Sequence, residues 1–436
     1  MRKLLFSLLL ALLVPMAAGA QEKEPYAVLS DGNTVLTFYY DDQKEARGGM
    51  DVGPFSGEPD YSSWYGQSQS ITSVVFDVSF AGCTTLTSTA YWFYELRRLS
   101  SITGISNLKT DNVTNMSNMF RYCFSLTSLD VTGFKTDNVT DMSFLFSGCS
   151  GLTSLDVTGF KTDNVTNMSN MFWDCSGLTS LDVTGFKTDN VTDMSFLFSG
   201  CSGLTSLDVT GFKTDNVTDM SGMFFGCSGL TSLDLTGFNT DNVMNMGGMF
   251  EICSGLTSLN LTGFKTDNVT DMSVMFFGCS SLTSLDVTGF KTDNVFNLYS
   301  MFGGCSSLTS LNLTGFKTDN VTFMDRVFYN CSGLTTIYAG DGWSTAKVTA
   351  GQDLFLGCTN LVGGAGTKYN ASHRDYTYAR IDGGSENPGY FTAKTEGSGE
   401  SHEGGSGQWK EGDLNHDGKL DAADIVVLVN LIMNQK

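Results

Sequence analysis

A 26-residue period is the feature that most constrains how this 436-residue chain can fold. One cysteine recurs in each period, at Cys123, Cys149, Cys175, Cys201, Cys227, Cys253, Cys279, Cys305 and Cys331. A unit this short cannot bury an apolar face by itself, so neighbouring units must stack to build a continuous core. The period therefore predicts a solenoid with one coil of chain for each repeat.

Two apolar patterns share each coil, as residues 152–177 (LTSLDVTGFKTDNVTNMSNMFWDCSG) illustrate. Leu155 and Val157 alternate with polar residues, which predicts a short strand with one buried face. The apolar residues from Val165 to Cys175 are spaced by three and four, which is typical of one or two helical turns. The predicted fold class is an α/β solenoid of short parallel strands and short helical turns.

Equivalent residues of successive coils are expected to lie beside one another. The phenylalanines that follow the glycine turn are predicted to form an internal aromatic column: Phe134, Phe160, Phe186, Phe212, Phe238, Phe264, Phe290 and Phe316. The asparagines of the recurrent TDN tripeptide, from Asn112 to Asn320, have two interpretations. They form a ladder whose amides cap backbone groups, or they are plain exposed turn residues.

The cysteines, eleven in total, leave three possibilities open. In an irregular coil Leu96 aligns with the cysteine position, which favours buried free thiols that act as apolar side chains. Disulfides between adjacent coils suit an exported protein, but parallel side chains give poor bridge geometry. A metal site is disfavoured because the chain has no Cys-x-x-Cys pair or nearby histidine.

The repeat motifs L-x-x-L-x-V, TDNVTNM and MF-x-x-C resemble the 26-residue repeat of BspA-like leucine-rich-repeat surface proteins of bacteria, a DUF285-type repeat. The resemblance extends from Ile71 to Thr392 and includes the segment YARIDGGSENPGYF at 378–391. It implies an exported adhesion or partner-binding protein, with no catalytic residues to carry over. The bacterial origin is likewise an implication of this resemblance.

The N-terminus predicts export. Arg2 and Lys3 precede an apolar run, and Ala18-Gly19-Ala20 offers a cleavage site, so residues 1–20 are interpreted as a signal peptide. The predicted location is secreted, extracellular or cell-surface. The apolar run is too short to cross a bilayer, and no later stretch reads as a membrane-spanning segment. A net charge of −21 makes nucleic acid a poor partner.

The chain divides into segments of different character, and residues 27–40 show two alternating runs around Asp31-Gly32, which predicts a hairpin. The predicted domains are a signal peptide (1–20), an N-terminal β cap (21–80), the leucine-rich-repeat solenoid (81–366), a C-terminal cap (367–393), a flexible linker (394–411) and a dockerin-like half module (412–436).

The last segment carries a calcium-loop pattern that ends before an apolar helix. Oxygen-bearing residues alternate around Gly418, where the loop must turn sharply. The predicted Ca²⁺ ligands are Asp413, Asn415, Asp417, Lys419, Asp421 and Asp424. The other interpretation is a degenerate acidic tail. The spacing resembles one half of a type I dockerin, which implies a cohesin-like partner, although a complete dockerin has two such halves.

Two positions vary most between otherwise similar coils, and they place aromatic residues on an expected outer face. The predicted partner-binding residues are Phe144, Trp173, Phe196, Phe225, Phe277 and Tyr329. Exposed aromatic residues in a row suggest a contact surface for protein or glycan. The alternative is a second apolar ladder packed between coils. The aspartates of the strand segments are interpreted as a solvated polar face, or as a site for a cationic segment.

These patterns favour a secreted or cell-surface protein that mediates adhesion to host extracellular matrix, bacterial surface proteins or glycans. The second hypothesis is a non-catalytic subunit of an extracellular glycan-handling assembly, docked through its calcium-binding C-terminus. Enzymatic activity is not expected, because the three histidines, His373, His402 and His416, lie in polar loop-like segments. A calcium-dependent hydrolase is the least favoured interpretation.

Overall fold

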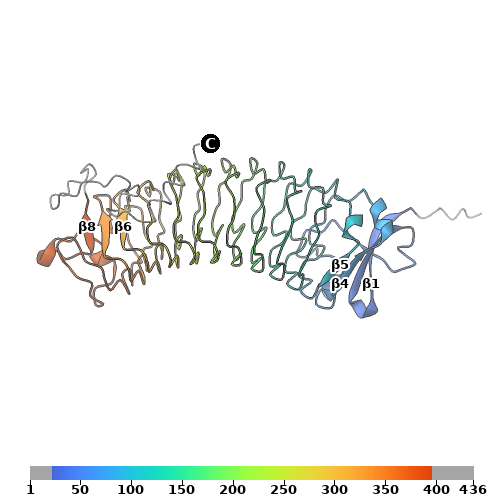
Figure 1. The fold of residues 1–436 in the computed structure, drawn as a ribbon, viewed down its shortest axis with the longest axis horizontal. Coiled ribbons are helices and arrows are strands. Elements are labelled where there is room, and N and C mark those ends of the chain that lie inside the picture. The colour runs from blue at the N-terminus through green and yellow to red at the C-terminus, as the bar shows by residue number, and fades with distance from the viewer. Residues whose placement is uncertain (1–21, 395–436) are drawn as a thin grey trace, which may run out of the picture. The chain divides into compact units, whose positions relative to one another are not determined.

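The computed structural model describes residues 22–394, which form one compact unit. Its coils stack side by side along one axis, between an N-terminal sheet and a C-terminal sheet (Figure 1). The predicted signal peptide, nearly all of the predicted linker and the predicted calcium loop lie outside the described residues. A solenoid of stacked coils was predicted from the period, and it is confirmed.

The N-terminal sheet has the strand order β3-β1-β2-β4-β5. Its strands are β1 (Glu24–Ser30), β2 (Val35–Asp41), β3 (Met50–Asp51), β4 (Ser73–Phe76) and β5 (Ser101–Thr103). Strands β1 and β2 pair antiparallel around the 3-10 turn η1 (Asp31–Asn33), which confirms the predicted hairpin. Strand β2 then pairs parallel with β4, and β4 with β5, so the hairpin covers the open edge of the first coils.

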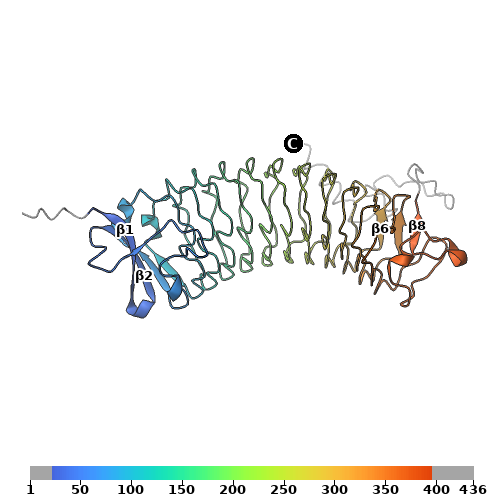
Figure 2. The same cartoon turned by 180° about the vertical axis from the view of Figure 1, so that it is seen from behind.

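The C-terminal sheet joins the last coils to the closing segment. It consists of the parallel strands β6 (Ser310–Leu313), β7 (Thr336–Ala339) and β8 (Phe391–Ala393), seen from behind in Figure 2. The remaining short 3-10 helices are η2 (Tyr65–Gln67), η3 (Val78–Gly82), η4 (Ile105–Asn107), η5 (Tyr376–Tyr378) and η6 (Gly384–Glu386).

The central coils depart from the prediction of a parallel strand in every repeat. Between β5 and β6 the segments that were predicted as strands form no regular ladder, and one bridge joins Asp234 to Asn260. A local bond competes with the ladder: the Asp156 carboxylate accepts the Thr158 N–H at 3.0 Å and its hydroxyl at 2.7 Å. Such side-chain bonds offer the backbone an alternative partner within its own coil.

The predicted helical turns are wrong, because the segment 141–148 and its equivalents form a ladder of turns, here called the turn ladder. The N–H groups of Phe144 and Phe146 donate to the next coil, to Ser169 and Met171, at 2.9 Å each. The N–H of Leu145 instead donates within its coil, to Met142, at 3.2 Å. A helix would keep every N–H inside its own coil, whereas this backbone uses alternate groups to bind its neighbour.

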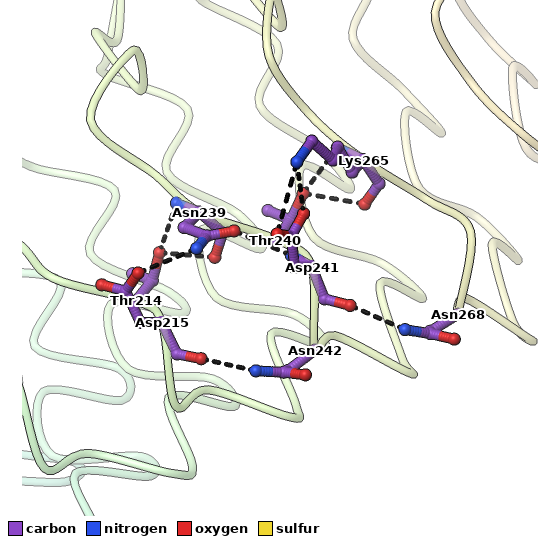
Figure 3. Close-up of polar contacts among 8 residues, drawn as sticks. All are labelled: Thr214, Asp215, Asn239, Thr240, Asp241, Asn242, Lys265 and Asn268. Atoms are coloured by element: carbon purple, nitrogen blue, oxygen red, sulfur yellow. Dashed lines mark hydrogen bonds and ion pairs between the residues drawn. The ribbon is translucent and has the colours of Figure 1, made fainter.

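The TDN tripeptide supplies a second set of contacts between coils (Figure 3). The Thr240 hydroxyl donates to the Lys265 carbonyl at 2.8 Å and accepts the Lys265 N–H at 2.7 Å. In the other direction, the Asn242 amide donates to the Asp215 carbonyl at 2.7 Å. The same bond recurs from Asn138 to Asn320, so the predicted asparagine ladder is confirmed. The buried threonine clamp was not foreseen.

Two phenylalanine columns fill the core. The predicted column is buried along its length, from Phe134 to Phe316. A second column forms the more regular stack, with neighbouring ring centroids 5.5–5.9 Å apart: Phe120, Phe146, Phe172, Phe198, Phe224, Phe250, Phe276, Phe302, Phe328 and Phe355. These rings belong to the MF-x-x-C motif, so aromatic residues line the core from both halves of the coil.

The cysteines are buried free thiols, as the sequence favoured. Ten of them donate Sγ–H to a phenylalanine carbonyl of the preceding coil, as Cys175 does to Phe146 at 3.1 Å. Burial raises the pKa of Cys279 and of Cys358 to about 12. These thiols therefore stay protonated near neutral pH and act as small apolar side chains that also satisfy a carbonyl.

We expect Thr240→Val to lower the free energy of unfolding by about 1–3 kcal/mol, since it removes the hydrogen-bond partner of the part-buried N–H and carbonyl of Lys265. Denaturant unfolding and hydrogen exchange across residues 214–268 would measure the loss. The control is Thr270→Val, which changes an exposed threonine of the next coil. Equal effects of the two substitutions would contradict a special role for the clamp.

Candidate functional site

The two variable positions of the repeat lie on the turn ladder, and the first has an unusual backbone. Its φ is between 49° and 65° in all nine coils, at Asn118, Phe144, Asn170, Phe196, Gly222, Gly248, Val274, Ser300 and Arg326. Glycine and asparagine suit this left-handed conformation, whereas other side chains cost about 1–2 kcal/mol. Phe144, Phe196 and Val274 therefore keep bulky side chains at a strained position, which is a mark of functional surfaces.

The second variable position lies three residues later, and its side chain varies in size from coil to coil. It holds Arg121, Ser147, Trp173, Ser199, Phe225, Glu251, Phe277, Gly303 and Tyr329 in successive coils. Large and small residues alternate from Arg121 to Phe225, whereas Phe225, Glu251 and Phe277 are large residues of three successive coils. Ser147 and Ser199 are fully covered, and their hydroxyls have no hydrogen-bond partner. This alternation is visible in the sequence and was missed there.

The six predicted aromatic residues all lie on this surface. Phe196 is exposed, while Phe144, Trp173, Phe225, Phe277 and Tyr329 are half-buried. The Phe196 ring occupies the space that a Cβ on Gly222 would need, and Phe277 does the same over Gly303. Each ring thus packs sideways on a small residue of the next coil and keeps part of its surface in solvent. The two interpretations from the sequence, an exposed contact surface and an apolar ladder packed between coils, each describe part of this arrangement. Binding itself stays a prediction.

At its N-terminal end the surface carries a tyrosine cluster that sequence reasoning missed. Tyr61 stacks on Tyr65 at 4.3 Å and on Tyr94 at 5.6 Å. The Arg121 guanidinium lies 4.2 Å from the Phe144 ring and 4.8 Å from Tyr122. Tyr94 aligns with the second variable position, so the repeat could have revealed it. Tyr61 and Tyr65 precede the repeats, and only the fold brings them here.

Towards the C-terminal end the same surface is hollowed into a cavity of about 240 Å³, here called the coil pocket. Its lining residues are Glu251, Val274, Phe277, Tyr299, Ser300, Arg326 and Tyr329. Two of them, Phe277 and Tyr329, were predicted as partner-binding. Tyr299 is exposed and stands where most coils carry serine. The replacement of serine by tyrosine at this position could have indicated the pocket from the sequence, and it was overlooked.

The charged groups of the coil pocket have opposite signs. Burial raises the pKa of the Glu251 carboxyl, and the Arg326 guanidinium lies 5.6 Å from the centroid of the Tyr329 ring. Among residues 22–394, the seven ion pairs include neither Glu251 nor Arg326. The pocket therefore offers an acceptor and a donor of hydrogen bonds between aromatic walls.

The strand face is polar and holds shallower hollows. One of about 620 Å³ is lined by residues between Ser258 and Asn312. The Thr158 hydroxyl and N–H lower the pKa of Asp156, which is exposed. This arrangement agrees with a solvated polar face. Within the described part of the chain, no three histidine, cysteine, aspartate or glutamate side chains gather as a metal site requires. The predicted calcium ligands lie beyond residue 394.

The geometry defines a non-globular repeat protein whose variable residues gather on one face. The repeats match the family described as "Mycoplasma protein of unknown function, DUF285" at residues 87–181, 175–260 and 252–365. The chain therefore belongs to this family, as the repeat motifs suggested. No curated protein matches the chain.

Two solved structures are similar to this chain. One is a leucine-rich repeat protein from Bacteroides ovatus ATCC 8483, with 17% identity, a TM-score of 0.36, and coverage of 78% of this chain and 92% of the other. The second is a leucine rich cell surface protein from Faecalibacterium prausnitzii A2-165, with 17% identity, a TM-score of 0.35, and coverage of 77% and 91%. Within residues 22–394, no helix has the length and apolar character needed to cross a bilayer.

A pair of substitutions tests the left-handed backbone of the turn ladder. Ile252 has φ 58° at a place where Gly226, one coil earlier, has φ 68°. We expect Ile252→Gly to raise the free energy of unfolding by about 1 kcal/mol and Gly226→Ala to lower it by about as much. A Cβ at Gly226 meets nothing closer than 3.7 Å, so the second change isolates the backbone term. Chemical denaturation measures both, and a neutral Gly226→Ala would contradict the proposed strain.

Proposed function

We propose that this protein is a secreted or cell-surface bacterial solenoid that mediates adhesion by binding host or bacterial surface proteins through its turn ladder. One observation carries the proposal: bulky side chains persist at left-handed backbone positions on a single face. Packing alone would be satisfied by glycine or asparagine there, as Gly222 and Asn170 show. Half-exposed aromatic residues such as Trp173 supply contact area at low entropic cost and are common binding hot spots.

The strand face is a poorer candidate for a partner. Its strand segments repeat the same leucine, aspartate and threonine positions in most coils, and its aspartates are exposed. A regular array of solvated carboxylates offers little apolar area to bury. The turn ladder offers variation from coil to coil, which a selective contact requires.

The test is a binding screen of the full chain against matrix proteins and bacterial surface proteins, followed by Trp173→Ala combined with Phe225→Ala. We expect the double variant to weaken the strongest interaction by at least about tenfold, because truncating a hot spot costs more than about 1 kcal/mol. Asp156→Asn on the strand face is the control. Unchanged affinity in a folded double variant would remove the turn ladder as the binding face.

We also propose that the C-terminal segment holds Ca²⁺ through Asp413, Asn415, Asp417, Lys419, Asp421 and Asp424. The support is the sequence spacing, which places oxygen donors on alternate residues around a glycine. Such a module would serve for docking to a cohesin-like partner, for retention or for pairing with another chain.

Calorimetric titration of the full chain with CaCl₂ tests the calcium proposal. We expect saturable binding at one site, and its loss in the variant Asp413→Ala combined with Asp417→Ala. Asp156→Asn again serves as the control, since its carboxylate lies in the repeats. Calcium binding that survives in the double variant would show that the ion binds elsewhere.

A further inference from the structure

The coil pocket lies beside the coil that carries small residues at both variable positions. In the coils of Ser147 and Ser199, the first variable position holds Phe144 or Phe196, and the hydroxyls at the second are completely covered. The coil of Ser300 and Gly303 is the one repeat of the nine in which both positions are small. Both residues are buried, with Gly303 under the Phe277 ring, and Ser300 is one of the residues that line the cavity of about 240 Å³.

Aromatic residues wall this space on both sides. Phe277 comes from the preceding coil and leans over Gly303, where a Cβ would lie 2.9 Å from its ring. Tyr329 comes from the following coil, and Tyr299 stands beside Ser300 in the small coil itself. The three rings therefore offer apolar faces to whatever enters from solvent.

The two charged side chains of the pocket limit which kind of molecule can bind there. The Glu251 carboxylate accepts hydrogen bonds, and the Arg326 guanidinium only donates them. A cation would be attracted by Glu251 and repelled by Arg326, and an anion would meet the reverse. A hydroxyl group both donates and accepts, so a neutral molecule with several hydroxyls can satisfy both side chains at once. A sugar ring combines such hydroxyls with an apolar C–H face that packs on aromatic rings.

We infer that the coil pocket binds one neutral hexose unit of a glycan, with the ring against Phe277 and Tyr329 and its hydroxyls on Glu251 and Arg326. The cavity has the size of a single sugar ring with its substituents rather than of an extended peptide. Its aromatic lining with a few polar groups is typical of small-molecule sites. This inference rests on the proposed function, because Phe277 and Tyr329 belong to the same turn ladder.

Exposed apolar residues on the neighbouring coils extend the surface. Phe296 and Phe323 are exposed and stand at repeat positions that carry mostly threonine and asparagine or aspartate elsewhere. They lie in adjacent coils, since the Phe323 N–H donates to the Phe296 carbonyl at 3.2 Å. Such departures from the repeat gather in the coils that build the pocket, which suggests that units next to the bound hexose also make contact.

The experiment is titration of the full chain with neutral oligosaccharides of glucose, galactose, mannose and N-acetylhexosamine, followed by calorimetry. We expect at least one to bind with a Kd below about 1 mM. Glu251→Gln and Arg326→Gln should each weaken that binding by at least about tenfold, because each removes a charge-assisted hydrogen bond. Asp174→Asn is the matched control, since burial also raises the pKa of this carboxyl, which lies on the turn ladder outside the pocket.

Other outcomes overturn the inference in distinct ways. No binding by any of these sugars, or binding that both pocket variants retain, removes the pocket as a hexose site. A protein partner that needs Glu251 but binds equally well after enzymatic deglycosylation would replace the sugar with a polypeptide. The adhesion proposal is judged separately, by the Trp173 and Phe225 double variant, so either idea can fail while the other stands.

Discussion

Backbone hydrogen bonds between coils are the constraint on which the rest of this structure depends. Alternate N–H groups of the turn ladder point to the next coil, as from Phe144 to Ser169, and the others close turns within the coil. This division requires left-handed residues four positions apart, such as Phe144 and Gly148. Because every coil repeats the pattern, each interior backbone segment has a partner on both sides.

The side-chain ladders follow from the same stacking. Once coils are in register, Thr240 can clamp both backbone groups of Lys265, and Asn242 can reach the Asp215 carbonyl. Ten cysteines complete the set by donating their Sγ–H groups to carbonyls of the preceding coil. A thiol at this place fills space and satisfies an acceptor, whereas Leu96 at the aligned place only fills space. These contacts explain why a cysteine-rich chain can be stable without bridges between its coils.

The interior contacts leave one surface free to vary. Core positions repeat because a changed side chain would break a column on both sides. On the turn ladder, a large residue needs only a small neighbour, as Phe196 has in Gly222. The side chains that would contact a partner can therefore differ in size from coil to coil. The coil pocket lies on this same surface, beside the coil of Ser300 and Gly303, whose two variable positions are both small.

The sequence by itself determined the stacked coils and the N-terminal hairpin, because period and register fix which residues become neighbours. It favoured buried thiols over disulfides, and it offered the asparagine ladder as one of two interpretations. It also located the aromatic residues of the turn ladder. Only the tertiary structure decided that the apolar spacing from Val165 to Cys175 is a ladder of turns, since a spacing of three and four fits both forms. Only the fold could place Tyr61 beside Tyr94, or hollow a pocket between Phe277 and Tyr329. Those features depend on which side chains the fold brings together and on the space that they leave between coils. Neither can be read from the repeat pattern alone.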